Sequence, residues 1–359
     1  MKRVLFTSSS YDRYDADCTL PSKFGRLLDA TGLEDKVRGR LTAVKMHVGR
    51  GIGYSTIHPL FVKILADRLR KYGAKVFITD HEVRDAASRG YREEYLGCPV
   101  VEVCGATGKY FYENHVDFGT FKNADIAGHI QDAEFLIDLS HVKGHGSCGF
   151  GGAIKNLAMG CVTDRTRQQI HGLEGGLDWN GGKCTHCGQC IKSCGHYANA
   201  FDSSDEYEVN YHHCTLCQHC AKVCPTGAIT VTDNKYGDFQ TGMAIATKAV
   251  LDAVGLERSY FINFLTNITA VCDCWGLTTP SIVPDIGIMA SEDIVAVERA
   301  SIDAIKLENL LQNGVPAGME LGTEGHLLER LHGKNLFLQL EKMEEMGLGT
   351  QEYSLDEVF

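Results

Sequence analysis

Two cysteine rows in the middle of the chain have the spacing of ligands to iron–sulfur clusters. Residues 184–194 read CTHCGQCIKSC and residues 214–224 read CTLCQHCAKVC, so each row has the pattern C-x2-C-x2-C-x3-C. A cubane [4Fe–4S] cluster needs thiolates that converge from four sides, and the fourth ligand of such a row comes from the other row. The two rows therefore predict two [4Fe–4S] clusters with crossed ligands.

Crossed ligation gives each cluster three cysteines of one row and the last cysteine of the other. The first cluster takes Cys184, Cys187, Cys190 and Cys224. The second takes Cys214, Cys217, Cys220 and Cys194. The alternative is a pair of zinc sites, but zinc gains nothing from a third and a fourth cysteine in one row. A disulfide framework is less favoured, because nothing in the sequence indicates secretion.

The segment Gly182–Asp233 resembles the bacterial-type two-cluster ferredoxins. Residues 224–229 read CPTGAI, which is that family's C-P-x-x-A-I tail. In the first row Cys194 is followed by Gly195, where the family usually has proline, and the linker after it is acidic. These departures leave the ligand count intact. They bear on the potential of the cluster held by Cys194, because hydrogen bonds and nearby charges tune it.

The composition is that of an acidic, cysteine-rich protein. The chain has 359 residues, 15 cysteines and a formal net charge of −11, and each oxidised cubane with its thiolates adds about −2. Such a charge disfavours nucleic acid as a partner. We expect a redox partner of the ferredoxin or flavodoxin type and a small-molecule substrate. The amino end does not look like a signal peptide and no stretch of eighteen apolar residues exists, so we expect no membrane span and a reducing, anaerobic cytoplasm.

Strands that alternate with helices predict an α/β fold with a mostly parallel sheet and helices on both faces. The strands are expected at Arg3–Ser8, Leu41–Val48, Lys75–Asp80, Glu134–Ser140, Tyr260–Val271 and Ile286–Met289. The helices are expected at Pro59–Tyr72, Gly152–Cys161, Gly242–Val254 and Glu292–Leu310. The predicted domains are an α/β domain in two parts, 1–180 and 234–359, interrupted by a two-cluster ferredoxin-like α+β insertion at 181–233.

Three of the expected strands run into loops rich in glycine, histidine, lysine or cysteine. Leu41–Val48 contains Lys45 and His47 and leads into Gly49–Thr56; the second loop is 141–152, and the third is 272–275. In an open parallel sheet, ligands bind beyond the carboxyl ends of the strands. If these strands are parallel neighbours, the three loops share one crevice.

The crevice residues fall into two chemical groups. The glycine turn and a lysine that would hold a small anion are Gly149, Gly151, Gly152 and Lys155. The side chains that would bind a further transition metal are His47, His141, His145, Cys272 and Cys274. Backbone N–H groups before a helix suit anions, and imidazoles with thiols suit metals. Catalysis is expected from Lys143, His145, Cys272 and Cys274, and the two cysteines would alternatively cycle as a disulfide.

At these loops the chain resembles the uncharacterised Fe–S centre proteins built on domain of unknown function 362. The similar stretches are GFGGAIKNLAMG at 149–160, CDC at 272–274, GIMASED at 287–293 and MGLG at 346–349. The resemblance implies an α/β domain with a two-cluster ferredoxin insertion, and it implies no reaction.

The function favoured by the sequence is an oxidoreductase in which the two clusters pass electrons to the crevice. A carrier alone would need only the ferredoxin-like part, and the rest of the chain builds a polar crevice of its own. Two other functions stay open. One is a non-enzymatic electron carrier whose α/β part docks a partner, and the other is a protein that handles a metal or cofactor.

Overall fold

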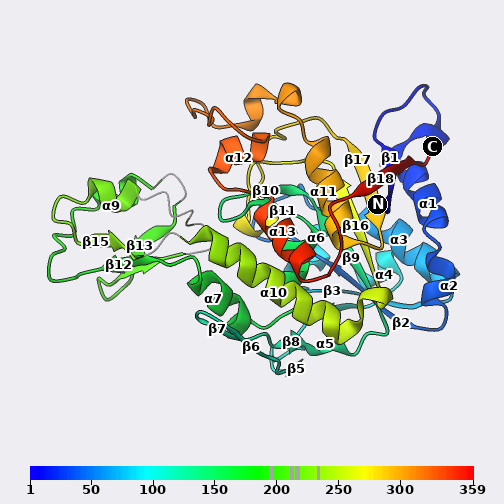
Figure 1. Cartoon of the computed structure of the whole chain (residues 1–359), viewed down its shortest axis with the longest axis horizontal. Coiled ribbons are helices and arrows are strands. Elements are labelled where there is room, and N and C mark those ends of the chain that lie inside the picture. The colour runs from blue at the N-terminus through cyan, green and yellow to red at the C-terminus, as the bar shows by residue number, and fades with distance from the viewer. Residues whose placement is uncertain (82, 195–196, 211–213, 215–218, 233–234) are drawn as a thin grey trace.

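The protein is built on one eight-stranded sheet (Figure 1), which a computed structural model describes for residues 1–81, 83–194, 197–210, 214, 219–232 and 235–359. The strand order is β18 (Tyr353–Glu357), β1 (Lys2–Ser8), β17 (Gly287–Ser291), β16 (Ser259–Leu265), β9 (Phe135–His141), β2 (Leu41–Met46), β3 (Lys75–Asp80) and β4 (Val100–Glu102). All neighbours pair in parallel except β17, which is antiparallel to both β1 and β16. The predicted α/β class with a mostly parallel sheet is confirmed.

Helices cover both faces of the sheet, because the central strands are apolar on both sides. Every residue of β16 is buried, as in a strand sandwiched between two helical layers. One face is covered by α1 (Leu20–Ala30), α2 (Leu33–Val37), α3 (Pro59–Lys71) and α4 (Glu93–Leu96). The other is covered by α5 (Gly128–Gln131), α6 (Ala153–Gly160), α7 (Asp164–Gly172), α10 (Tyr236–Val254), α11 (Ile294–Ala304), α12 (Leu327–His332) and α13 (Leu338–Glu345).

Helix α3 shows how local sequence sets an element in this fold. Pro59 occupies its first position, where a missing N–H costs nothing, and the His58 side chain accepts a hydrogen bond from the Leu60 amide. The apolar stripe of α3 is buried against the sheet. Gly73, with φ of +91°, ends the helix in the left-handed region that favours glycine.

The expected elements differ from the structure mainly at their ends. The strand expected over Tyr260–Val271 ends at Leu265, and the helix expected over Glu292–Leu310 is only α11. Residues 266–271 therefore form a loop, in which Thr269 accepts a hydrogen bond from the Gly144 amide. A Cβ on Gly144 would overlap the carbonyl of Ala270, so glycine is what allows this loop to lie directly on Lys143–His145.

The insertion is a separate small unit that projects from one end of the α/β domain (Figure 1). Its elements are β12 (Leu177–Trp179), α8 (Gln189–Lys192), β13 (Asn199–Phe201), β14 (Tyr207–Val209), α9 (His219–Val223) and β15 (Ile229–Val231). Strands β12 and β15 pair antiparallel within this unit, so the structural unit begins slightly before residue 181. At the base, the Thr232 amide donates to the Gly176 carbonyl at 3.0 Å.

Three short strand pairs of the α/β domain lie outside the main sheet. They are β5 (Phe111–Tyr112) with β8 (Ile126–Ala127), β6 (His115–Phe118) with β7 (Phe121–Asn123), and β10 (Lys143–His145) with β11 (Gly149–Gly151). Across the described parts of the chain, every helix is too short or too polar to cross a lipid bilayer.

The sheet reverses its direction of winding between β2 and β9. From β2 the chain crosses the α1–α3 face to β3, whereas from β9 it crosses the α6–α10 face to β16. Strands β2, β3, β9 and β16 are all parallel, so their carboxyl ends lie at one edge. Ligand sites of open α/β sheets lie at such a reversal.

Strands from both sides of the insertion interleave, so the α/β domain should fold only from both parts together. A fragment of residues 1–180 lacks the neighbours of β1 and one neighbour of β9, and we expect it to be insoluble or to unfold without cooperativity in urea. The matched control replaces residues 178–230 by a two-residue turn, which the antiparallel pairing of Leu177 with Val231 permits, and should unfold cooperatively. A cooperative transition in the 1–180 fragment would contradict the discontinuous domain.

Candidate functional site

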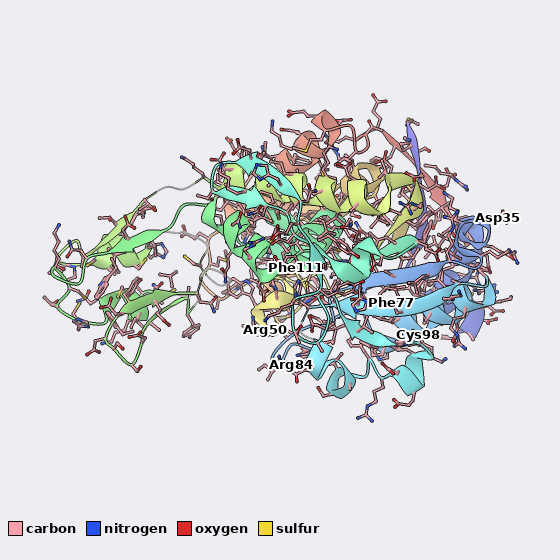
Figure 2. All side chains as sticks on the ribbon, turned by 90° about the horizontal axis from the view of Figure 1, so that it is seen from below. Asp35, Arg50, Phe77, Arg84, Cys98 and Phe111 are labelled. Atoms are coloured by element: carbon pink, nitrogen blue, oxygen red, sulfur yellow. A yellow bond between two sulfur atoms is a disulfide. The ribbon has the colours of Figure 1, made fainter. Side chains whose placement is uncertain are left out.

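A large pocket lies beyond the carboxyl ends of β2, β3 and β9, and all three predicted loops reach it. It contains about 1010 Å³ of empty space, including its open mouth. Its lining is formed by Lys45, His47, Gly49, Arg50, Asp80, His81, His141, Lys143, His145, Gly151, Gly152, Lys155, Asn156, Met159, Gly160, Arg167, His171, Phe239, Cys272, Asp273 and Cys274. Figure 2 shows Arg50 on the side of the α/β domain nearer the insertion, and Asp35 at the far end.

One wall of the pocket is held by a buried lysine–aspartate–histidine network at the ends of β2 and β3. Asp80 accepts hydrogen bonds from Lys45 Nζ and His47 Nδ1, both at 2.9 Å. Burial alone would raise the pKa of Asp80, but the charges of Lys45 and His47 outweigh it and hold this pKa well below its usual range. His47 Nε2 is buried and has no hydrogen-bond partner among the described residues. Of the predicted histidines, His47 thus keeps a ring nitrogen for a ligand or a proton.

A second network of the same composition holds the opposite wall. Asp273 accepts from Lys143 Nζ at 2.6 Å through Oδ1 and from His141 Nδ1 at 3.0 Å through Oδ2. Burial alone would raise the pKa of Asp273, but its contacts with His141 and Lys143 keep it well below the usual range. His141 Nε2 faces the carbonyl of Thr266 at 2.6 Å. Both ring nitrogens of His141 therefore face acceptors, and neither offers a lone pair to a metal.

Asp273 is the middle residue of the C-x-C turn, so the second network also presents the two cysteines to the pocket. Cys272 and Cys274 form a disulfide. Lys155 Nζ, from α6, lies 3.6 Å from Cys272 Sγ and 3.5 Å from Cys274 Sγ. Burial lowers the pKa of Lys155 to about 8. Among the described residues no carboxylate forms an ion pair with this lysine, and its Nζ donates to the two sulfurs.

His145 completes the group around the sulfurs. Its ligand atom and those of Cys272 and Cys274 all lie within 4.8 Å of one another, and within the described residues this is the one such group of three. His145 Nδ1 accepts a hydrogen bond from the Ser147 amide at 3.2 Å. Since that amide can only donate, the neutral ring carries its proton on Nε2.

The predicted anion-binding turn differs from what the structure shows. Gly149–Gly151 form strand β11, and the first amide of α6, at Ala153, donates to Glu298 Oε1 at 2.6 Å. A Cβ on Gly152 would overlap that carboxyl oxygen. The start of α6 is therefore closed by the Glu298 carboxyl group. Lys155, two residues after Ala153, does line the pocket.

Two buried carboxyl groups lie beneath the pocket in the packing between α6 and the sheet. Burial raises the pKa of Glu298 to about 8 and that of Asp138 to about 7, although each accepts hydrogen bonds that lower it. Asn156 links this layer to the pocket, because its amide donates to Asp138 Oδ1 and its oxygen accepts from Lys45 Nζ.

Four predicted cluster ligands line one cavity in the insertion. Cys184, Cys187, Cys190 and Cys224 surround about 310 Å³ of empty space, together with Trp179 and Phe201. No three of these sulfurs lie within 4.8 Å of one another. The Ala228 amide donates to Cys224 Sγ at 3.2 Å. Burial acts to raise the pKa of Cys224, but this and other hydrogen bonds lower it overall, as suits a thiolate ligand.

The second predicted ligand set is described only in part. Cys194 and Cys214 belong to one group of packed side chains that also contains Ala198. The Ala198 amide donates to Cys194 Sγ at 3.3 Å. Cys220 is buried nearby with Cys190. Cys217 lies outside the described residues.

Sequence reasoning missed the anionic members of the site, Asp80 and Asp273, and the role of Lys45. The signal was present: each aspartate ends or follows a strand, and each network contains a lysine and a histidine two positions apart, K-M-H and H-V-K. To predict that each triplet pairs with a buried aspartate, one would need the order of the strands in the sheet, which the sequence does not show.

The chain is similar to a known protein family and to solved structures. The family model of the domain of unknown function DUF362 matches residues 42–303. Two solved structures are similar: the lactate racemase apoprotein from Thermoanaerobacterium thermosaccharolyticum (12% identity, 74% of this chain, 51% of that chain, TM-score 0.39) and a protein from Thermotoga maritima (11%, 70%, 52%, 0.37). The chain thus spans about half the length of each structure, and neither bears on the chemistry of the site. No curated protein matches the chain.

Replacing Asp273 by asparagine should destabilise the α/β domain strongly, because Lys143 is only 1% exposed and would lose its counter-charge. We expect Asp273→Asn to lower the free energy of unfolding by about 3–5 kcal/mol, measured in urea. The control Asp252→Asn breaks the exposed Lys248–Asp252 pair and should cost less than about 1 kcal/mol. Equal, small effects of both changes would contradict the role given to the network.

The buried acid Glu298 should make stability fall as the pH rises. The unfolded chain loses this proton near pH 4.5, but the folded chain keeps it until about pH 8, so the folded state binds more protons between these values. Between these pH values the carboxyl of Glu298 lowers the free energy of unfolding by about 1.4 kcal/mol per pH unit, and Glu298→Gln should abolish that contribution. Exposed Glu257, changed to glutamine, should leave the slope as it is. An unchanged slope in Glu298→Gln would show that this carboxyl titrates normally.

Proposed function

The chain belongs to the family of the domain of unknown function DUF362, and within that family we propose that it is an iron–sulfur oxidoreductase. Two [4Fe–4S] clusters, held by the crossed cysteine rows, would supply single electrons to a small-molecule reaction in the α/β pocket. The observation that carries this proposal is the pairing of two structures in one chain: a cavity lined by three cysteines of the first row and one of the second, and a pocket with its own cysteines, lysine and imidazoles.

The insertion fits the cluster at Cys184, Cys187, Cys190 and Cys224. These cysteines come from both rows and share one cavity, as crossed ligation requires. The spread of their sulfurs over more than 4.8 Å suits a multi-iron cluster better than a single tetrahedral zinc, whose ligands converge on one atom. Apolar neighbours and amide donors to sulfur are the features that tune a cluster's potential.

Residues close together in the chain line the cysteine cavity and the pocket. Trp179, at the end of β12, lines the cysteine cavity, and His171, at the end of α7, lines the pocket. These residues are eight positions apart, so their Cα atoms lie within about 28 Å of each other. His171 stacks on Phe239 with a distance of 5.2 Å between the ring centres. Phe239 belongs to α10, the helix that follows β15 along the chain. The two segments that enter and leave the insertion thus build one wall of the pocket.

The pocket suits a small anionic substrate that exchanges a proton. Its two carboxylates, Asp80 and Asp273, are each already neutralised by a buried lysine. Lys155 and Arg167 add positive charge to the lining. His47, held by Asp80 through Nδ1, presents Nε2 for proton transfer, which is the geometry of a general base or acid. His47→Gln would keep the size and remove this exchange.

A cluster-content experiment tests the proposal. Anaerobically purified or reconstituted protein should contain about eight iron atoms and about eight labile sulfides per chain. Cys187→Ala and Cys224→Ala should each lose the same electron paramagnetic resonance signal, since both cysteines line one cavity, whereas Cys194→Ala should lose the other. Cys18→Ser, outside the insertion, is the matched control and should keep both signals. Four irons or fewer after reconstitution, or a stoichiometric zinc content, would refute the proposal.

A further inference from the structure

We propose that Cys272 and Cys274 are a redox-active pair, which stores two electrons at the floor of the pocket beside Lys155. The pair is a disulfide when oxidised, and a thiolate paired with the Lys155 ammonium plus a neutral thiol when reduced. Only the identity of the electron donor, a low-potential iron–sulfur cluster, rests on the proposed function. The site itself stands on the contacts around the two sulfurs.

The bond between these cysteines has no structural task. A disulfide stabilises mainly by closing a loop in the unfolded chain, and the cysteines are separated by only two positions. The turn is already fixed by its middle residue, because Asp273 is held by Lys143, His141 and Ser55. The backbone of the turn therefore keeps its position when the bond opens, and the two sulfurs separate by rotation of their side chains.

Lys155 favours the reduced form. Its Nζ lies 3.6 Å and 3.5 Å from the two sulfurs, and an ammonium stabilises a neighbouring thiolate far more than a disulfide. Burial raises the pKa of the nearby Cys148 thiol to about 12, although the charge of Lys155 acts to lower it. Among the described residues, the cysteines that line the pocket are Cys272 and Cys274, whereas Cys148 is fully buried.

A metal bound by His145, Cys272 and Cys274 is less consistent with the same contacts. A histidine that ligates a metal usually donates its second ring N–H to an acceptor, whereas Nδ1 of His145 accepts from the Ser147 amide. A cation bound between the sulfurs would also face the Lys155 ammonium at close range. The geometry fits a thiolate–ammonium pair better than a thiolate–metal bond.

The redox step balances within the pocket. Reduction adds two electrons and one proton to the disulfide and breaks the S–S bond. One sulfur keeps its negative charge beside Lys155, and the other takes the proton from solvent that enters through the pocket mouth. Two clusters that each deliver a single electron match this demand.

Differential alkylation tests the proposal on the full, cluster-loaded chain. Protein is equilibrated anaerobically with defined ratios of reduced to oxidised dithiothreitol, quenched with acid, alkylated with N-ethylmaleimide and analysed by peptide mass spectrometry. The peptide with Cys272 and Cys274 should be unmodified before reduction and doubly modified after it. Cys18 should be modified in both states and serves as the internal standard.

Variants of Lys155 separate the redox role from a structural one. Lys155→Met should lower the equilibrium constant for reduction by about tenfold, because the thiolate loses its ammonium partner. Lys155→Arg should restore most of it, and Lys248→Met, which changes an exposed lysine of α10, should have no effect. A pair that resists reduction, is alkylated before reduction, or retains a stoichiometric metal ion through dialysis would overturn the proposal. So would an equilibrium constant that is equal in Lys155→Met.

A one-electron donor distinguishes this inference from the proposed function. Photoreduced deazaflavin should reduce the pair quickly in the wild type and at least about tenfold more slowly in Cys187→Ala, which lacks one cluster. If dithiothreitol reduces the pair in both proteins but the two rates with deazaflavin are equal, the redox pair stands and the electron path from the clusters falls.

Discussion

Two buried aspartates, each shared between a lysine and a histidine, determine where everything else in the pocket lies. Lys143 is 1% exposed, and its charge is tolerable there only because Asp273 lies 2.6 Å away. Asp273 in turn belongs to the C-x-C turn, so the ion pair attaches that turn to the end of β9. The equivalent pair of Lys45 and Asp80 attaches β2 to β3 and orients His47. A site assembled at the ends of three strands is held together by buried charges whose separation would be costly.

The same networks explain why glycine is needed where two of the loops meet. The segment before Cys272 lies directly on Gly144, and Gly160 of α6 lies against the ammonium end of Lys45. Side chains at either position would push the networks apart. Above them, α6 is anchored by Glu298 rather than by a ligand, which leaves Lys155 to face the sulfurs. The chemistry of the pocket thus comes from side chains on rigid elements, as preorganised sites require.

Much of the fold could be predicted from sequence, because its signals are local. Apolar runs with proline and glycine at their ends give β2, α3 and β3 almost to the residue. The antiparallel strand β17, and the loop that replaces the end of the predicted strand before Cys272, depend on long-range pairing. The glycine turn at 149–152 looked like an anion loop, since nothing in the sequence shows that Glu298, far along the chain, closes it. The meeting of the three loops followed from the parallel sheet, whereas the aspartates that hold them required the strand order.

The insertion and the pocket act together in this account: the clusters deliver electrons one at a time, and the C-x-C pair holds two. Trp179 at the end of β12 lines the cysteine cavity, His171 at the end of α7 lines the pocket, and the C-x-C pair lies on the pocket lining. An anaerobic coulometric titration tests this most directly, because it counts the electrons that each chain accepts. The account predicts about four electrons in the wild type, two for the clusters and two for the pair, and about two in the Cys272→Ser/Cys274→Ser variant. An equal count in both proteins would contradict it.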